Sequence, residues 1–246
     1  MKLREIFQKI RKNLLTRGYT CDCCGRELFD YPEHRFCVPC EEKLPTIQNP
    51  CPKCGRDKTA EGVCLTCKSN MPKFTQGVAA FSYKGEAGSV INRMKNGNRR
   101  LAAYLGERMA ERTLPFLQEG EELLLIPVPL TAQRKKERGY NQAELLAESM
   151  QAYFQRIGRE AELDSAVLEK RRETEAQKQK TAKERIENVK GAYHVHKRKA
   201  CEGKTVLLID DVLTTGATGS ECARLLLSAK AKRVLFIVAG ARDEKR

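Results

Sequence analysis

Residues 206–221 read VLLIDDVLTTGATGSE, and this stretch decides the fold of the chain. Its first four residues are apolar and form a short run of the kind that fills a buried parallel strand. Asp210 and Asp211 follow where that strand is expected to leave the sheet, and a small, hydroxyl-rich turn then opens a helical pattern. A flexible glycine, the free amides of a helix N-terminus and threonine hydroxyls together make a cradle for an anion such as phosphate.

The expected cradle consists of five consecutive residues, Thr214, Thr215, Gly216, Ala217 and Thr218. The two carboxylates would repel a phosphate, so we expect them to bind sugar hydroxyls or a divalent cation. This pattern resembles the phosphoribosyl pyrophosphate (PRPP) motif of type I phosphoribosyltransferases. The simpler alternative is an ordinary strand followed by an N-capped helix. A Walker-type nucleotide loop is excluded because G-x-x-x-x-G-K-[ST] does not occur in the chain.

Composition limits the class of protein. A length of 246 residues predicts one or two domains. The longest apolar runs are strand-sized and well short of the ~20 residues that cross a bilayer, and the N-terminus MKLREIFQKIRK lacks the features of a secretory signal. We therefore expect a cytoplasmic protein with no membrane span. A formal charge of +14 favours nucleic acid, phosphorylated metabolites or an acidic protein as partner, with a merely solvated basic surface as the alternative.

Four C-x-x-C units lie between residues 21 and 67: Cys21/Cys24, Cys37/Cys40, Cys51/Cys54 and Cys64/Cys67. Two structural zinc sites of four cysteines each would use all eight thiols and stabilise a module with little apolar sequence. One zinc with spare thiols is the alternative, and Cys23 is a substitute ligand. If the first two pairs share one zinc ion and the last two share the other, the module consists of tandem ribbons. If alternating pairs share a zinc ion, the module is interleaved. Disulfides are not expected in a cytosolic chain.

The order of patterns predicts the domain organisation. Residues 2–15 have the periodicity of an amphipathic helix, and a polar linker covers 68–76. Beyond it, expected strands at 78–83, 123–129, 206–209 and 233–239 alternate with helices at 86–94, 101–117 and from 141 onward. This alternation predicts an α/β fold, a mostly parallel sheet with helices on both faces and a site at the carboxyl ends of the strands. The expected parts are an N-terminal helix (1–18), a double zinc ribbon (19–70) and a phosphoribosyltransferase-like domain (77–246).

Residues 130–140, LTAQRKKERGY, are expected to form a long polar loop after the second strand. Arg134 and Arg138 in this loop would neutralise a pyrophosphate group opposite the cradle. The basic turn at 95–100 is expected to be solvent-exposed.

Three motifs together resemble the ComF family of late-competence proteins. They are PVPL…R…RGYNQAELLA, R-x-x-T-x-x-Q…R-x-x-N-x-x-G-A-Y and IDDVLTTGAT. The resemblance implies a zinc module followed by a phosphoribosyltransferase-like domain, with structural Zn²⁺ and with PRPP and Mg²⁺ at Asp210 and Asp211. It implies that residues 171–188 form a hood over the ligand, for which a solvated helix or a disordered connector is the alternative, and that the fold serves either binding or a transferase step.

The resemblance also implies a cytoplasmic role in the uptake of transforming single-stranded DNA. The implied partners are that DNA and a competence helicase-like ATPase of the ComFA type. The alternative is a metabolic phosphoribosyltransferase that transfers ribose phosphate to a nucleobase or an amine.

Overall fold

The computed structural model describes residues 20–29, 35–59, 61–173 and 182–244. Contacts divide the chain into two compact units, Met1–Leu44 and Pro45–Arg246, so the second half of the cysteine-rich region belongs to the unit that contains the sheet. The sequence predicted the end of the zinc module at residue 70 and the start of the second domain at residue 77. The division at residue 44 falls well before both, and the expected domain limits remain a prediction. The helix predicted for residues 2–15 lies outside the described residues.

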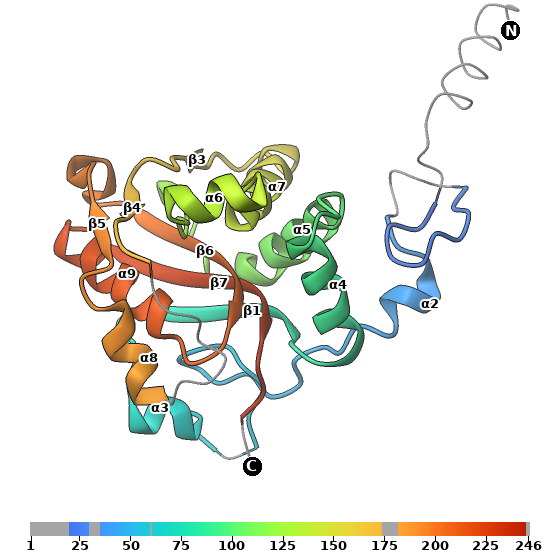
Figure 1. Ribbon diagram of the computed structural model, residues 1–246, viewed down its shortest axis with the longest axis horizontal. Coiled ribbons are helices and arrows are strands. Elements are labelled where there is room, and N and C mark those ends of the chain that lie inside the picture. Colours follow the sequence, from blue (N-terminus) through green and yellow to red (C-terminus); the bar gives the residue numbers. More distant parts are fainter. Residues whose placement is uncertain (1–19, 30–34, 60, 174–181, 245–246) are drawn as a thin grey trace, which may run out of the picture. The chain divides into compact units, whose positions relative to one another are not determined.

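The larger unit is built on a five-stranded sheet in the order β1-β7-β6-β2-β3, and every pairing between these strands is parallel (Figure 1). This arrangement confirms the predicted α/β class. The strands are β1 (Gln76–Ser82), β2 (Leu123–Pro127), β3 (Glu162–Leu163), β6 (Thr205–Leu213) and β7 (Arg233–Ala241).

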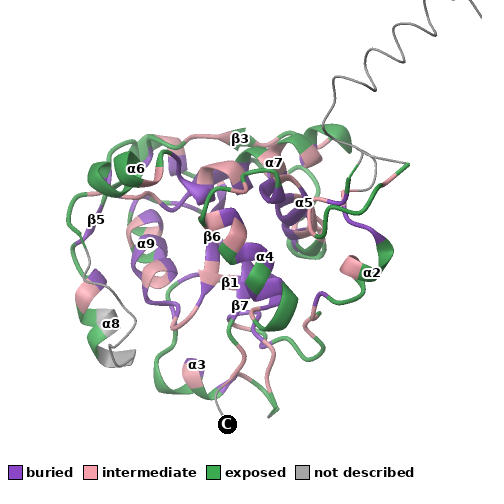
Figure 2. Cartoon of the chain, turned by 45° about the vertical axis from the view of Figure 1, so that its right-hand side comes forward, coloured by how far each residue is buried: buried purple, intermediate pink, exposed green. Residues whose placement is uncertain are grey.

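Helices cover the sheet on both faces. The helices α5 (Leu101–Thr113) and α7 (Gln142–Arg156) pack together and against the strands, joined by α4 (Gly85–Lys95) beside β1 and β7. The helix α9 (Ala217–Ser228) packs on the other face, where its apolar residues share a core with alternate residues of β6 and β7. Buried residues accordingly gather in the central strands and on the sides of the helices that face them (Figure 2).

The strand β6 is longer than its apolar run indicates. It continues through both aspartates to Leu213, because β7 runs beside it over the same length and pairs Gly240 with Val212 and Ala241 with Leu213. Asp210 and Asp211 therefore lie within the last part of the strand and not after it, which corrects the expected strand end at residue 209.

The segment predicted as a long polar loop after β2 contains a short helix, α6 (Ala132–Arg138). The hydroxyl of Thr131 caps its N-terminus by accepting a hydrogen bond from Arg134 N at 3.3 Å. Gly139 ends it in the left-handed conformation, with φ 77°. The loop prediction was wrong here because a helix without an apolar face has no periodicity to detect.

The remaining elements are short. The strands β4 (Leu168–Lys170) and β5 (Tyr193–Val195) form an antiparallel pair, followed by the turn η3 (Arg198–Cys201), and α8 (Ala182–Val189) precedes β5. The turn η1 (Leu114–Phe116) follows α5, and the cysteine-rich parts contain α2 (Val38–Glu41) and α3 (Leu65–Ser69). The expected hood covers residues 171–188. Its middle part, residues 174–181, lies outside the described residues. Among the helices that the structure describes, none is both long and apolar enough to cross a bilayer.

Candidate functional site

The predicted anion cradle forms at the carboxyl edge of the sheet. The strand β6 delivers Asp210 and Asp211 to this edge, and α9 starts at Ala217 directly after Gly216, whose φ of 80° favours glycine. These residues line a hollow of about 260 Å³ together with Thr214, Thr215 and Thr218. The structure thus brings together all seven residues that the sequence predicted for the two acidic positions and the cradle.

The cradle has the electrostatic character of an anion site. The helix α9 begins with small and hydroxyl-bearing residues and has no acidic residue in its first turn. Its N-terminal amides and dipole therefore present positive potential to the hollow. Thr215 Oγ1 accepts a hydrogen bond from Ala217 N at 3.4 Å, which fixes the turn that leads into the helix.

The two aspartates have different surroundings. Asp211 is buried, and its Oδ1 pairs with the ammonium group of Lys95 at 2.9 Å. Asp210 Oδ1 accepts a hydrogen bond from Asp211 N at 2.8 Å. Burial, together with the neighbouring Asp211 carboxylate, raises the pKa of Asp210 to about 7, against the opposing effects of Lys95 and Lys170. The Asp210 carboxyl group therefore holds its proton to a higher pH than an exposed aspartate does.

Lys95 was not predicted as a site residue, because the turn that it begins was expected to be solvent-exposed. Its side chain is 23% exposed and reaches from the end of α4 to Asp211. Lys95 also lines a second hollow, of about 350 Å³, together with Arg134 and Arg138. The two predicted pyrophosphate residues therefore lie in a basic hollow that adjoins the cradle through Lys95, and neither of them lines the cradle itself.

The arginines of α6 are held outside the cradle by local contacts. Arg134 is exposed and lies 3.8 Å from a carboxylate oxygen of Glu173. Arg138 donates to the side-chain oxygen of Gln142 at 2.5 Å. Glu173 is exposed, whereas Gln142 is buried, so the contact of Arg134 is the more open to solvent of the two.

Two more residues near Asp210 were missed by sequence reasoning. Burial raises the pKa of Tyr193 well above its usual value, with smaller contributions from Cys222 and Asp210, and burial lowers the pKa of Lys170. The Lys170 ammonium group lies 5.7 Å from the Tyr193 ring centre. They come from β4 and β5. The G-A-Y motif predicted a strand at Tyr193, whereas the short strand that holds Lys170 gave no recognisable alternation.

The eight paired cysteines form two clusters. The sulfur atoms of Cys21, Cys24, Cys37 and Cys40 lie within 4.8 Å of one another, and so do those of Cys51, Cys54, Cys64 and Cys67. The pairs are thus shared consecutively, which decides between the two arrangements left open by the sequence. Cys23 belongs to neither cluster.

Both clusters fit zinc. Tetrahedral Zn–S bonds of ~2.3 Å place the sulfurs ~3.8 Å apart, and the Cys24–Cys37 and Cys54–Cys64 sulfur separations are each 3.7 Å. In each cluster one sulfur also accepts a hydrogen bond from a backbone amide at 3.3 Å. Each group can therefore hold one zinc ion, while Cys201 and Cys222 are buried elsewhere.

Comparisons with known proteins agree with this architecture. A family model described as "Phosphoribosyl transferase domain" matches residues 137–246. Competence protein ComFC of Bacillus subtilis is 28% identical over 230 residues, which cover 85% of each chain. Competence protein F of Haemophilus influenzae is 29% identical, over 85% of this chain and 91% of the relative. DNA utilization protein YhgH of Shigella flexneri is 28% identical, over 78% and 84% respectively. These similarities extend over most of each relative's length.

Proposed function

We propose that the site of this chain binds PRPP, or a closely related phosphorylated sugar, together with Mg²⁺, since the chain is similar to ComF competence proteins and its residues 137–246 match a phosphoribosyl transferase domain. The observation that carries this proposal is the meeting of an acidic pair and a helix-N-terminal cradle in one hollow. A phosphate group suits the helix amides and threonine hydroxyls. The adjacent carboxylates suit sugar hydroxyls and a hard cation.

The roles follow from the chemistry of each part. The turn from Thr214 to Thr218 binds the 5-phosphate, and Asp210 and Asp211 hold the ribose hydroxyls and Mg²⁺. Arg134 and Arg138 neutralise the pyrophosphate in the adjoining basic hollow. Mg²⁺, when bound, would neutralise charge on a departing pyrophosphate. In a transferase step these arginines would stabilise the same charge, and the acidic pair would face the oxocarbenium-like ribose.

For the biological role, we propose a cytoplasmic competence function in which the protein assists the uptake of transforming single-stranded DNA. The support lies in the names of the relatives, which are competence and DNA utilization proteins, and in the charge of +14, which suits a polyanionic partner. A helicase-like ATPase of the ComFA type is the proposed protein partner.

A metabolic phosphoribosyltransferase is the second candidate. The presence of both an acidic pair and a basic hollow favours it, because a transferase needs groups for the ribose and for the leaving pyrophosphate. Release of pyrophosphate from PRPP in the presence of a panel of nucleobases and amines would support this candidate. Single-stranded DNA binding that weakens linearly with the logarithm of salt concentration would support the first.

Ligand binding is tested by calorimetric titration of PRPP with Mg²⁺. We expect Asp211→Asn to weaken binding at least tenfold. The matched control is Glu202→Gln, in the turn before β6 and away from the site, which removes an exposed carboxylate that pairs with Lys230. Equal affinity of wild-type and Asp211→Asn protein would refute the assignment of the site.

A further inference from the structure

The sequence C-x-x-C-G-R occurs twice, at 21–26 and at 51–56. The two copies fold alike. In each, the glycine amide donates to the first cysteine carbonyl at 2.8 Å, and the first cysteine amide donates to the arginine carbonyl, at 2.6 Å and 2.8 Å. A single antiparallel bridge, Thr20 with Glu27 or Pro50 with Asp57, closes each turn. The two arginines therefore occupy equivalent backbone positions beside equivalent cysteine clusters.

The side chains of these arginines have different environments. Arg26 is exposed, whereas Arg56 is only 4% exposed. Arg56 Nε donates to the sulfur of Cys54 at 3.3 Å, and its Nη2 donates to the backbone carbonyl of Thr214 at 2.7 Å. One buried guanidinium therefore joins a cysteine of the second cluster to the first residue of the anion cradle.

The charge of the cluster explains why an arginine is tolerated there. A buried guanidinium requires nearby negative charge. Four thiolates around one Zn²⁺ leave two net negative charges, and the Cys54 sulfur is in direct contact with Arg56. A zinc ion held by this cluster would thus leave negative charge that stabilises the buried Arg56 guanidinium.

The second ribbon is packed tightly beneath the cradle. A Cβ atom on Gly55 would lie 2.5 Å from the carbonyl oxygen of Gly77, and one on Gly77 would lie 2.5 Å from that of Cys54. The fully buried Phe74 connects this region to the cradle. Its ring centre lies 5.3 Å from that of Phe236, and its Cε1 lies 3.9 Å from the point that a Cβ atom on Gly216 would occupy. This packing leaves Arg56 little freedom to move relative to the cradle.

We propose that Arg56 is a positioning residue that makes the second zinc ribbon part of the ligand site. A trans peptide group is planar, with its carbonyl and amide pointing in opposite directions. The hydrogen bond from Arg56 holds the Thr214 carbonyl toward the ribbon. The Thr215 amide, which belongs to the same peptide group, must then point in the opposite direction, away from Arg56, and this sets the path of the turn into α9. The inference rests on the proposed function only in taking the Thr214–Thr218 turn as the phosphate cradle.

The test compares Arg56→Gln with Arg26→Gln, the same substitution at the equivalent position of the first ribbon, in protein carrying both zinc ions. Hydrogen exchange of a peptide covering residues 212–219 is the primary measurement. We expect Arg56→Gln to accelerate exchange in this segment about tenfold relative to wild type, and Arg26→Gln to leave it unchanged. Arg56→Lys should restore part of the protection, because one ammonium group cannot reach both acceptors as a fork does.

Ligand binding provides a second readout. Affinity for PRPP should fall about tenfold in Arg56→Gln, whereas affinity for pyrophosphate alone, assigned to the basic hollow, should stay the same. If wild-type protein binds no PRPP, the proposed function fails, and the exchange measurement still decides the role of Arg56. Equal exchange at 212–219 in the Arg56→Gln and Arg26→Gln proteins would overturn the proposal, and so would acceleration spread evenly over the whole sheet.

Discussion

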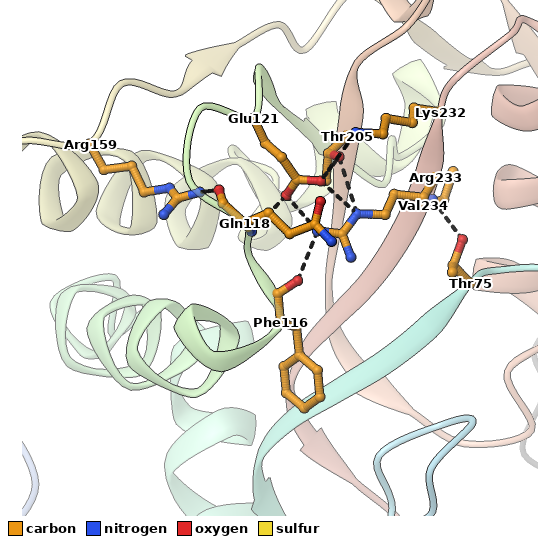
Figure 3. A network of polar contacts seen from close by, with 9 residues as sticks. All are labelled: Thr75, Phe116, Gln118, Glu121, Arg159, Thr205, Lys232, Arg233 and Val234. Carbon is orange, nitrogen blue, oxygen red and sulfur yellow. Dashed lines mark hydrogen bonds and ion pairs between the residues drawn. The ribbon is translucent and has the colours of Figure 1, made fainter.

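Replacing Glu121 by glutamine should destabilise the sheet domain at the end opposite to the ligand site. The Glu121 side chain is 4% exposed, and its carboxylate accepts hydrogen bonds from Nε and Nη2 of Arg233, at 3.0 Å and 2.5 Å. It also accepts from the Thr205 hydroxyl and the Gln118 amide, each at 3.0 Å (Figure 3). Thr205 and Arg233 begin β6 and β7, so this one carboxylate joins the starts of the two central strands.

The expected cost follows from these contacts. A hydrogen bond to a charged group contributes about 1.5–3 kcal/mol. Glutamine keeps the shape, but it loses the charge and turns an NH₂ group toward donors. The Arg233 side chain is 21% exposed, so water compensates part of the loss. We therefore expect a loss of about 2–3 kcal/mol in the free energy of unfolding, or roughly 4–12 °C in Tm for a domain of this size.

Urea unfolding at several pH values measures this loss. Burial alone would raise the pKa of Glu121, but Arg233, the Gln118 amide and the Thr205 hydroxyl outweigh it and lower the pKa. A carboxyl group with a lowered pKa in the folded state contributes stability above its unfolded pKa, near 4.5 here, and loses it as the pH falls. The difference between wild type and Glu121→Gln should therefore be full at pH 7 and shrink below about pH 5.

The matched control is Glu119→Gln, at an exposed position two residues away, which should change stability by less than about 0.5 kcal/mol. Zinc content should stay the same in both variants. A loss below about 0.5 kcal/mol in Glu121→Gln, or a difference that grows on acidification, would refute the reasoning.

Three further predictions concern the site and the clusters. Lys95→Met should lower the free energy of unfolding by about 2 kcal/mol, because it leaves the buried Asp211 carboxylate unpaired; Asp211→Asn in the same chain should recover part of the loss in a double-mutant cycle. Cys64→Ser should reduce bound zinc from two ions to one and lower the Tm of the sheet domain, because Cys64 belongs to the core of that domain. Cys37→Ser should also lose one zinc ion but leave that Tm unchanged, because Cys37 belongs to the other unit. Elemental analysis measures the zinc and calorimetry measures the Tm. Burial and the Asp211 carboxylate raise the pKa of Asp210 to about 7, so protonated Asp210 contributes stability that is full below about pH 4 and is lost as the pH rises through 7. In urea titrations without magnesium, the free energy of unfolding of Asp210→Asn relative to wild type should therefore rise between about pH 5 and 8. A difference that does not change with pH would contradict this.

Local patterns were sufficient to predict four strands of the sheet, all but β3, and the turn that forms the cradle. The apolar run at 206–209 predicted the centre of β6, and the hydroxyl-rich turn with Gly216 predicted where α9 begins. Both signals lie in neighbouring residues, and burial on both faces requires the apolar run. The continuation of β6 through two aspartates was not predictable in this way, because it depends on the partner strand reaching Ala241.

Other features depend on contacts that a sequence does not display. Thr131 and Gly139 are suitable caps for α6, and these caps were the signal that could have predicted the helix. Lys95 acquires its role from an ion pair with a residue far along the chain. Arg56 and Arg26 have the same local motif, so the sequence does not show that Arg56 contacts the carbonyl of Thr214. The sharing of cysteine pairs depends in the same way on how the ribbons fold.

The contact between Gly55 and Gly77 has a consequence for how this protein can be rebuilt. Neither position has room for a methyl group, because each glycine meets backbone of the other segment. Among the described residues, nothing lies within 4 Å of the corresponding point on Gly25 in the first ribbon. Gly25 has a positive φ of 76°, which favours glycine, so the loop of the first ribbon is restricted by its backbone conformation and not by a neighbouring segment among the described residues. A graft at the second must carry its glycine and a matching glycine at the start of β1, so ribbon and strand can be transplanted only as a pair.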